Sequence, residues 1–154
     1  MVKAKDIMTT NPITVSPQTD ITRAARLLLD HHINGLPVVD EDERLVGIIC
    51  QSDLITLQKR IRLPSVFTLL DTFIPVRSPK AIDKELEKIA AATVAQAMTD
   101  KPLVIGPETG LEEIATLMVE KNLHTLPVVH KGKLVGIVGK EDVLATLMPS
   151  REEA

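Results

Sequence analysis

Aromatic side chains are nearly absent from this chain of 154 residues. It has no Trp and no Tyr, and its two phenylalanines are Phe67 and Phe73. A core must therefore be built from Val, Ile, Leu, Ala and Met, in a composition that is 44% hydrophobic and 25% charged, as in an ordinary soluble globule. Stacking of nucleobases on aromatic platforms is largely excluded.

Cysteine and long apolar runs are also scarce. Cys50 is the single cysteine, which excludes an intrachain disulfide and a thiolate metal cage and agrees with a reducing compartment. No run approaches the roughly 20 apolar residues of a spanning helix, and the first residues do not resemble a signal peptide. We therefore expect a cytoplasmic protein without a membrane partner.

Charge of one sign is not in large excess, and catalytic motifs are missing. The chain has 18 Lys and Arg against 21 Asp and Glu, a net charge of -3 without a basic cluster, so nucleic acid is not an expected partner. No Ser/His/Asp set or Gly-rich phosphate loop is present, which predicts no enzyme activity. His31 and His32 are adjacent at a predicted helix end, where their side chains diverge by about 100°, and His130 lies in a predicted turn. We expect no metal and no cofactor.

An internal repeat organises the chain. Asp6–Pro12 matches Gln96–Pro102 with an offset of 90 residues. The match continues to the end of the unit, with one deletion in a turn: Leu36–Val39 with Leu126–Val129, Leu45–Ile49 with Leu134–Val138, and Asp53 with Asp142. Two copies of one unit therefore run head to tail.

Each copy predicts a short strand, a helix, two strands and a final helix. The capping candidates Thr19, Asp20 and Thr109 precede apolar residues at helical spacing. Those residues are Ile21, Ala24, Ala25, Leu28 and Leu29 in copy one and Leu111, Ile114, Ala115, Met118 and Val119 in copy two. Two β-branched runs around a polar turn then predict a hairpin, and the final helix begins near Gln51 or Lys140.

We predict four segments: a first repeat at 1–58, a helical insert at 59–92, a second repeat at 93–148 and a tail at 149–154. Helices are expected in the insert at Ser65–Asp71 and at Ile82–Ala90. They either cover an open edge of the module or provide a dimer contact or a lid over a ligand cleft. The apolar helical faces of the repeats and the apolar residues of the insert predict a homodimer.

The series of motifs resembles a known family. Asp-Ile-Met-Thr near the start, Leu-Pro-Val-Val in the middle and Leu-Val-Gly-Ile-Ile running to Ser-Asp-Leu occur in order in copy one, and copy two repeats the series with substitutions. This series is similar to the CBS domain family, named after cystathionine β-synthase, over about 110 residues. The resemblance implies an α/β (α+β) fold in which two β-α-β-β-α repeats pair about a pseudo-twofold axis, with a cleft on each side of that axis.

The resemblance also implies a ligand and a motif that binds it. In the family, such clefts hold adenosine-containing ligands such as AMP, ADP, ATP, S-adenosylmethionine or NAD. The ligand motif runs Gly, an apolar residue, any residue, Ser or Thr, two variable residues and Asp, at the step from strand to final helix. Here it reads Gly47–Asp53 and Gly136–Asp142, so both aspartates are kept. Each could accept hydrogen bonds from ribose hydroxyls, while unpaired amides of the helix start face phosphate. The alternative role is a first-turn carboxylate that favours its helix dipole.

Both hydroxyl positions of the motif are lost in this chain. Cys50 and Gly139 stand there, and each missing hydrogen bond weakens the phosphate end by about 1 kcal/mol. Ser52 and Lys140 lie close by in sequence and could compensate.

By resemblance, each cleft combines the aspartate of one copy with the first strand and the Leu-Pro turn of the other. The expected ligand-binding residues of one cleft are Ile48, Cys50, Ser52, Asp53, Lys101, Leu103, Leu123 and His124. Those of the other are Ile137, Gly139, Lys140, Asp142, Ile13, Ile33 and Asn34. Ile13, Ile33, Leu103 and Leu123 would sandwich a purine, with plain core packing as the alternative. Lys101 and His124 make the Asp53 cleft the better candidate for phosphate.

The resulting hypothesis is a regulatory module that senses an adenine nucleotide or S-adenosylmethionine and is read by an unknown effector protein. The alternative is a constitutive scaffold whose clefts have lost their ligand.

Overall fold

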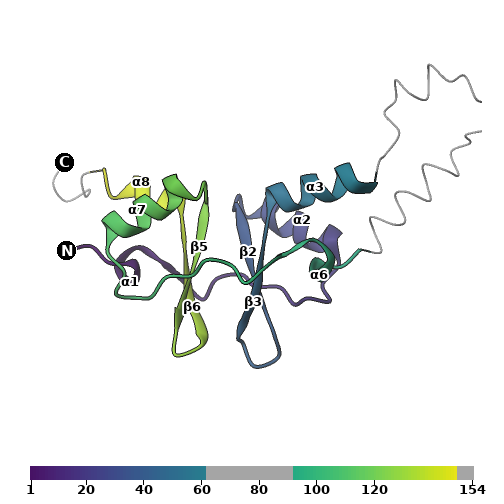
Figure 1. The fold of residues 1–154 in the computed structure, drawn as a ribbon, viewed down its shortest axis with the longest axis horizontal. Helices are drawn as coiled ribbons and strands as arrows, with labels where there is room; N and C mark the ends of the chain where they lie inside the picture. The colour runs from purple at the N-terminus through teal and green to yellow at the C-terminus, as the bar shows by residue number, and fades with distance from the viewer. Residues whose placement is uncertain (62–91, 149–154) are drawn as a thin grey trace, which may run out of the picture.

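The computed structural model describes residues 1–61 and 92–148. These residues form two units of similar shape that lie side by side, each with a β-hairpin and two longer helices (Figure 1). The predicted insert helices and the predicted tail lie outside the described residues. The mixed α/β class is confirmed by two three-stranded sheets, each associated with helices.

Each sheet takes one strand from the other repeat. The first sheet has the order β2-β3-β4 and the second the order β1-β6-β5, and all neighbours are antiparallel. The bounds are β1 Thr9–Thr10, β2 Gly35–Val39, β3 Leu45–Cys50, β4 Thr99–Asp100, β5 Thr125–His130 and β6 Lys133–Gly139. Thus β1 of repeat one pairs with β6 of repeat two, and β4 of repeat two pairs with β3 of repeat one. The two repeats hold each other through these exchanged strands.

A short helix anchors each exchanged strand to the opposite repeat. Helix α1, Ala4–Ile7, buries Ala4 completely in the core of repeat two, and the Ala4 N–H donates to the Thr109 carbonyl at 2.8 Å. Helix α6, Val94–Ala97, buries Val94 in the core of repeat one, where its N–H donates to the Thr19 carbonyl at 2.8 Å. These short helices were not predicted, since four residues carry too little periodicity to reveal a helix.

The glycine of the repeated Leu-Val-Gly motif lets the exchanged strand approach closely. A Cβ at Gly136 would lie 2.6 Å from Met8 Sδ and 3.0 Å from the Thr9 carbonyl oxygen. A Cβ at Gly47 would lie 2.7 Å from Met98 Sδ and 2.9 Å from the carbonyl oxygen of Thr99. Because the second neighbour is backbone in both cases, a side chain would push the exchanged strand away.

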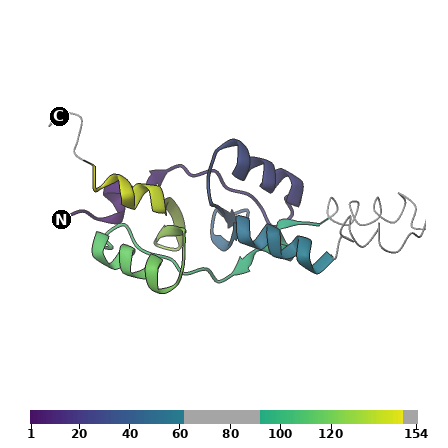
Figure 2. The same cartoon turned by 90° about the horizontal axis from the view of Figure 1, so that it is seen from above.

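The longer helices match the predicted positions. They are α2 Ile21–Asp30, α3 Gln51–Ile61, α7 Leu111–Glu120 and α8 Lys140–Ala145. Seen from above, α2 and α3 lie over one repeat and α7 and α8 over the other (Figure 2). Ile21, Ala24 and Leu28 are buried as their spacing predicts, whereas Leu29 is 69% exposed and its counterpart Val119 is 81% exposed. The predicted core face of these helices was therefore one residue too wide.

The predicted N-cap position is right for α2, where it is Asp20, and wrong for α7, where it is Gly110 and not Thr109. Neither Asp20 nor Gly110 forms a side-chain cap. The hydroxyl of Thr109 instead accepts from the Gly106 N–H at 3.0 Å, and Thr19 does the same for Ser16. The threonines thus stabilise the turn that precedes each helix.

The hairpin turns differ between the repeats. In repeat one, Asp40 Oδ1 accepts from the N–H groups of Asp42 and Arg44, both at 2.9 Å. In repeat two, Lys131 and Gly132 have φ values of 51° and 81°, as a tight two-residue turn with a primed geometry requires. No helix within 1–61 or 92–148 is long and apolar enough to cross a membrane.

Candidate functional site

Two clefts lie where the repeats meet. Cleft one, around Asp53, has a volume of about 380 Å³, and cleft two, around Asp142, has about 230 Å³. The predicted residues that line cleft one are Ile48, Cys50, Ser52, Asp53, Leu103, Leu123 and His124. Those that line cleft two are Ile13, Ile33, Asn34, Ile137, Gly139 and Asp142. The structure therefore brings together, in the expected combination, thirteen of the fifteen residues predicted from the sequence.

Lys101 and Lys140 do not line the clefts. Both side chains are exposed. Lys101 has a φ of 50°, in a turn just before the lining residues Pro102 and Leu103, and Lys140 lies between the lining residues Gly139 and Glu141. Their expected contribution to phosphate binding thus has no support from the geometry of the clefts.

The predicted first-strand residues Ile13 and Leu103 lie outside the strands. Each follows the end of β1 or β4 by three residues, in irregular backbone. Leu103 is 42% exposed and Ile13 is half-buried, so both side chains reach the cleft walls without entering the closed core. Because both side chains are partly exposed, they are better placed to contact a ligand in the cleft than to serve as core residues alone.

Each aspartate closes the N-terminus of its own helix. Asp53 Oδ2 accepts from the Cys50 N–H at 2.8 Å, and Asp142 Oδ2 accepts from the Gly139 N–H at 2.8 Å. This contact is one half of a capping box, in which the third helical residue reaches back to the N-cap amide. Each aspartate therefore has the structural role named as the alternative: it stabilises its helix start through a hydrogen bond as well as through the helix dipole.

The second oxygen of each carboxylate stays available to a ligand. Asp53 Oδ1 lies 3.4 Å from the Thr99 hydroxyl, a long and weak hydrogen bond. Asp142 Oδ1 has no hydrogen-bond partner within 1–61 and 92–148. Capping and acceptance from a ribose hydroxyl can thus be carried by different oxygens of one side chain.

Fewer helix-start amides are free than the sequence suggested. The Gln51 N–H donates to the Asn34 carbonyl at 3.2 Å, and the Lys140 N–H donates to the His124 carbonyl at 3.0 Å. With Cys50 and Gly139 bound to the aspartates, the first two amides at each helix start are already paired. At α3, the N–H groups of Ser52 and Asp53 remain as donors without a partner in the described part of the chain.

Cys50 presents a neutral thiol to cleft one. Burial, and then the nearby Asp53 carboxylate, raise the pKa of this thiol to about 11. At neutral pH it is therefore protonated, a weak donor and a poor nucleophile.

Sequence reasoning missed the partition between the clefts. Asn34 and Thr125 line both clefts, and Thr125 is 7% exposed. A Cβ at Gly35 would lie 3.3 Å from Thr125 Cβ and 3.2 Å from Cys50 Sγ, so the starts of β2 and β5 pack directly on each other. Gly35 and Thr125 are equivalent positions of the two repeats, related by the offset of 90 residues. Equivalent residues can meet where the two repeats pack on each other, so this pair was the sequence signal for a wall common to both clefts.

Glu141 is a second missed residue. It lines cleft two, and its Oε1 accepts from Asn34 Nδ2 at 3.5 Å, across the boundary between the repeats. Its counterpart in cleft one is Ser52. The clefts therefore differ in charge at equivalent positions.

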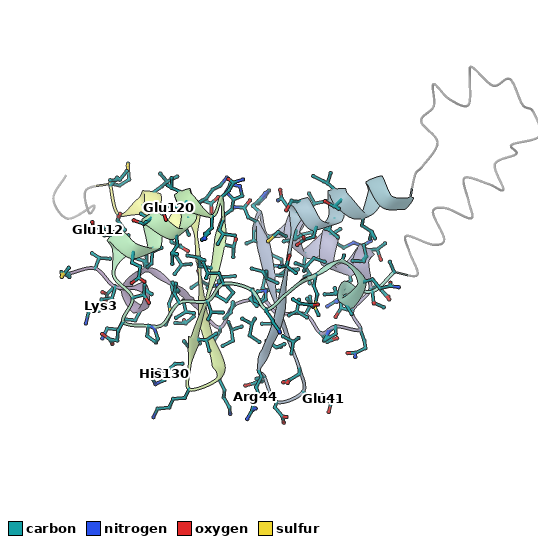
Figure 3. The ribbon with its side chains drawn as sticks, in the orientation of Figure 1. Lys3, Glu41, Arg44, Glu112, Glu120 and His130 are labelled. Carbon is teal, nitrogen blue, oxygen red and sulfur yellow. The ribbon has the colours of Figure 1, made fainter. Side chains whose placement is uncertain are left out.

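No metal-binding cluster is found among the described residues. Within 1–61 and 92–148, no group of three or more His, Cys, Asp or Glu side chains could hold a metal ion. His130 lies at the end of a hairpin, exposed and far from the helices that border the clefts (Figure 3).

Comparison with known proteins identifies the repeated unit. Residues 4–60 and 94–149 match the model of the CBS domain. The chain is 35% identical to CBSX1, a chloroplastic CBS domain-containing protein of Arabidopsis thaliana, over 84% of this chain and 56% of that protein. It is 34% identical to the uncharacterized protein MJ1426 of Methanocaldococcus jannaschii, over 94% of this chain and 90% of that protein. The chain thus spans little more than half of CBSX1 but most of MJ1426.

Solved structures agree with the fold and show ligands in similar proteins. CBSX2 of Arabidopsis thaliana, solved in complex with AMP, superposes with a TM-score of 0.71 at 30% identity, covering 96% of each chain. The CBS domain pair of protein MJ0100, solved with methylthioadenosine and S-adenosylmethionine, gives a TM-score of 0.68 at 28% identity, also covering 96% of each chain.

Proposed function

The chain belongs to the CBS domain family, and we propose that it is a regulatory module whose two clefts bind adenosine-containing ligands. The observation that supports this most is the composition of each cleft. An aspartate with one carboxylate oxygen that is not used in capping faces apolar side chains contributed by the opposite repeat, Leu103 and Leu123 in cleft one and Ile13 and Ile33 in cleft two. A ribose and a purine need these two kinds of surface.

The phosphate of AMP fits cleft one. Helix α3 has 11 residues, and the amides of Ser52 and Asp53 lie at its N-terminus, where the helix dipole favours an anion. The Ser52 hydroxyl and the His124 side chain line the same cleft and add donors that compensate for the missing hydroxyl at Cys50. Cleft one is therefore the stronger nucleotide site.

A ligand in either cleft contacts both repeats and would change how they pack. Such a change acts as a signal when the two packings bind the ligand with different affinity. A separate effector protein would read the change. The similar proteins with AMP, methylthioadenosine and S-adenosylmethionine support the class of ligand.

We also propose that the module is a homodimer in a reducing, cytoplasmic compartment. Leu29, Ile55, Val119 and Leu144 are each at least 58% exposed, and they occupy equivalent positions of the two repeats. Paired helices with exposed apolar residues fit a second copy of the same chain. Sedimentation at micromolar concentration should give the mass of a dimer, and a clean monomer would overturn this part of the proposal.

A scaffold without a ligand is the second candidate. The loss of a side-chain hydroxyl at both Cys50 and Gly139 favours it. Thermal melting with a panel of adenosine, AMP, ATP and S-adenosylmethionine separates the two, because a ligand that binds the folded state alone raises the melting temperature. An increase with at least one compound supports the sensor, and no increase at millimolar concentration supports the scaffold. Turnover of the same compounds would reveal an enzyme.

A further inference from the structure

The charged groups that line cleft two are both carboxylates. Glu141 and Asp142 line this cleft, and its other described lining residues carry no Lys, Arg or His side chain. Among the described residues that line cleft one, Asp53 is the one carboxylate, and His124 comes from the other repeat. Cleft two therefore presents about one more negative charge than cleft one at neutral pH.

The two carboxylates of cleft two flank the position where the phosphate end of a ligand is expected. A Cβ at Gly139 would lie 3.4 Å from Glu141 Oε2 and 3.7 Å from Asp142 Oδ2. Gly139 occupies the motif position that Cys50 holds in cleft one, where a neutral thiol is present. An anion at this point of cleft two would meet two like charges at short range.

Other features of cleft two agree with a ligand that has no phosphate. Its volume of about 230 Å³ is well below the 380 Å³ of cleft one. Helix α8 has six residues against 11 in α3, so a dipole would offset little of the repulsion. The Asn34 amide, which could donate to an anion, already points its Nδ2 at Glu141.

We propose that cleft two selects nucleosides whose 5′ substituent is uncharged or positively charged, and that Glu141 sets this selectivity. The inference rests on the proposed function, because it takes both clefts as nucleoside sites and assigns a different ligand charge to each. A cationic 5′ group gains Coulomb energy from Glu141 and Asp142, whereas the phosphate of AMP, with a charge of roughly -2 at pH 7, is repelled.

A series of three ligands tests the charge preference directly. 5′-Amino-5′-deoxyadenosine, adenosine and AMP share one nucleoside and differ in charge at the 5′ position. Each is titrated into the full chain and followed by amide NMR, with the Gly139 amide as the reporter of cleft two and the Cys50 amide as the reporter of cleft one. At Gly139, the amino compound should bind about tenfold or more tightly than AMP, with adenosine between them.

Two reciprocal variants assign the preference to Glu141. Glu141→Gln keeps the shape of the side chain and one oxygen that can accept from Asn34. It should cut the ratio between the amino compound and AMP at Gly139 by about tenfold, with adenosine changed less than twofold. Ser52→Glu places the equivalent carboxylate in cleft one and should weaken AMP at the Cys50 reporter by about tenfold. A glutamate in the first turn suits the start of α3, so the fold should tolerate it. Glu112→Gln, on the exposed face of α7, is the control for the same loss of net charge (Figure 3).

The outcomes separate this inference from the function on which it rests. If none of the three compounds shifts either reporter at millimolar concentration, the proposed function itself fails. If adenosine binds but AMP binds cleft two as tightly as the amino compound, charge selection is overturned and the nucleoside site stands. If the preference is present but Glu141→Gln changes it no more than Glu112→Gln does, the role of Glu141 is overturned.

Discussion

The two clefts are built from equivalent positions of one repeated unit, and they differ in the side chains that face the ligand. Cleft one has Ser52 and His124 where cleft two has Glu141 and Asn34. The aspartate that caps the following helix is present in both, with the same 2.8 Å hydrogen bond. Duplication has thus kept what the fold needs and varied what a ligand would contact.

A second difference concerns how the exchanged segments are held. Lys3 and Lys5 both donate to the Glu108 carboxylate, which ties α1 to repeat two, with Lys5 at 2.8 Å. The offset of 90 residues places Thr93 and Ala95 at the positions equivalent to Lys3 and Lys5, and Gln18 at the position equivalent to Glu108. None of these three residues is charged, so the other exchange cannot form the same ionic contact. The glycines that admit the exchanged strands are common to both. We therefore expect both exchanged strands to depend on the same close packing against a glycine, and only the α1 exchange to depend on an ion pair.

The largest effect is expected from filling the two glycine positions. Gly47→Ala and Gly136→Ala should each destabilise the fold by about 3 kcal/mol, because the new methyl group meets a methionine sulfur and a backbone oxygen at 3.0 Å or less. Gly110→Ala is the control, since nothing lies within 4 Å of a Cβ there. Chemical denaturation measures all three. If only one of the two glycine variants lost a large part of its free energy of unfolding, the two exchanged strands would not be equivalent.

The next effect concerns the ligand. Asp53→Ala should weaken AMP binding by about 1.5 to 3 kcal/mol, the range for hydrogen bonds to a charged group, and Asp142→Ala should weaken it less. Isothermal calorimetry on both variants measures the difference. Unchanged AMP affinity in Asp53→Ala, or a larger loss in Asp142→Ala, would reverse the assignment of the stronger cleft.

Without a ligand, the same two variants should lose similar amounts of stability. Each removes the carboxylate that accepts from an N-cap amide, which costs about 1 kcal/mol. Asp53→Asn and Asp142→Asn keep an oxygen acceptor and should lose less. Melting curves of the ligand-free proteins measure this, and a loss confined to one repeat would show that the caps are not equivalent.

The smallest effect is expected from the ionic contact of Glu108. Hydrogen bonds from Lys3 and then Lys5 lower the pKa of this carboxyl from 4.5 to about 2. Because the pKa is lower in the folded state, the contribution to stability is present above pH 4.5 and is lost as the pH falls toward 2. Glu108→Gln should remove this part of the acid dependence, by a small amount that shrinks further in salt, since the Glu108 side chain is exposed. Urea denaturation at several pH values measures it, and an unchanged acid slope would contradict the assignment.

Much of the fold and the site could be predicted from the sequence because both depend on patterns that occur twice. The helical spacing around Ile21 and Ile114 predicts α2 and α7 from local sequence alone. The polar turns predict the two hairpins in the same way. The family resemblance then placed Asp53 with Leu103 and His124, and Asp142 with Ile13 and Asn34, and the clefts contain these sets. Agreement of two copies made each local signal stronger than it would be alone.

The remaining features depend on contacts that no local pattern encodes. A strand as short as Thr9–Thr10 has no readable alternation, and its partner β6 lies more than a hundred residues away. Lys140 was predicted at the site, but its neighbour Glu141 lines the cleft, since successive residues of a helix point about 100° apart. Element positions were therefore predictable, while strand partners and side-chain directions required the structure.

A crystal structure of the chain grown with AMP tests the assignment of the two clefts most directly. We predict adenosine density in cleft one, with the ribose on Asp53 Oδ1, the base between Leu103 and Leu123, and the phosphate at the start of α3. Cleft two should hold no phosphate. AMP bound outside both clefts, or with its phosphate beside Glu141 and Asp142, would contradict the assignment of the clefts.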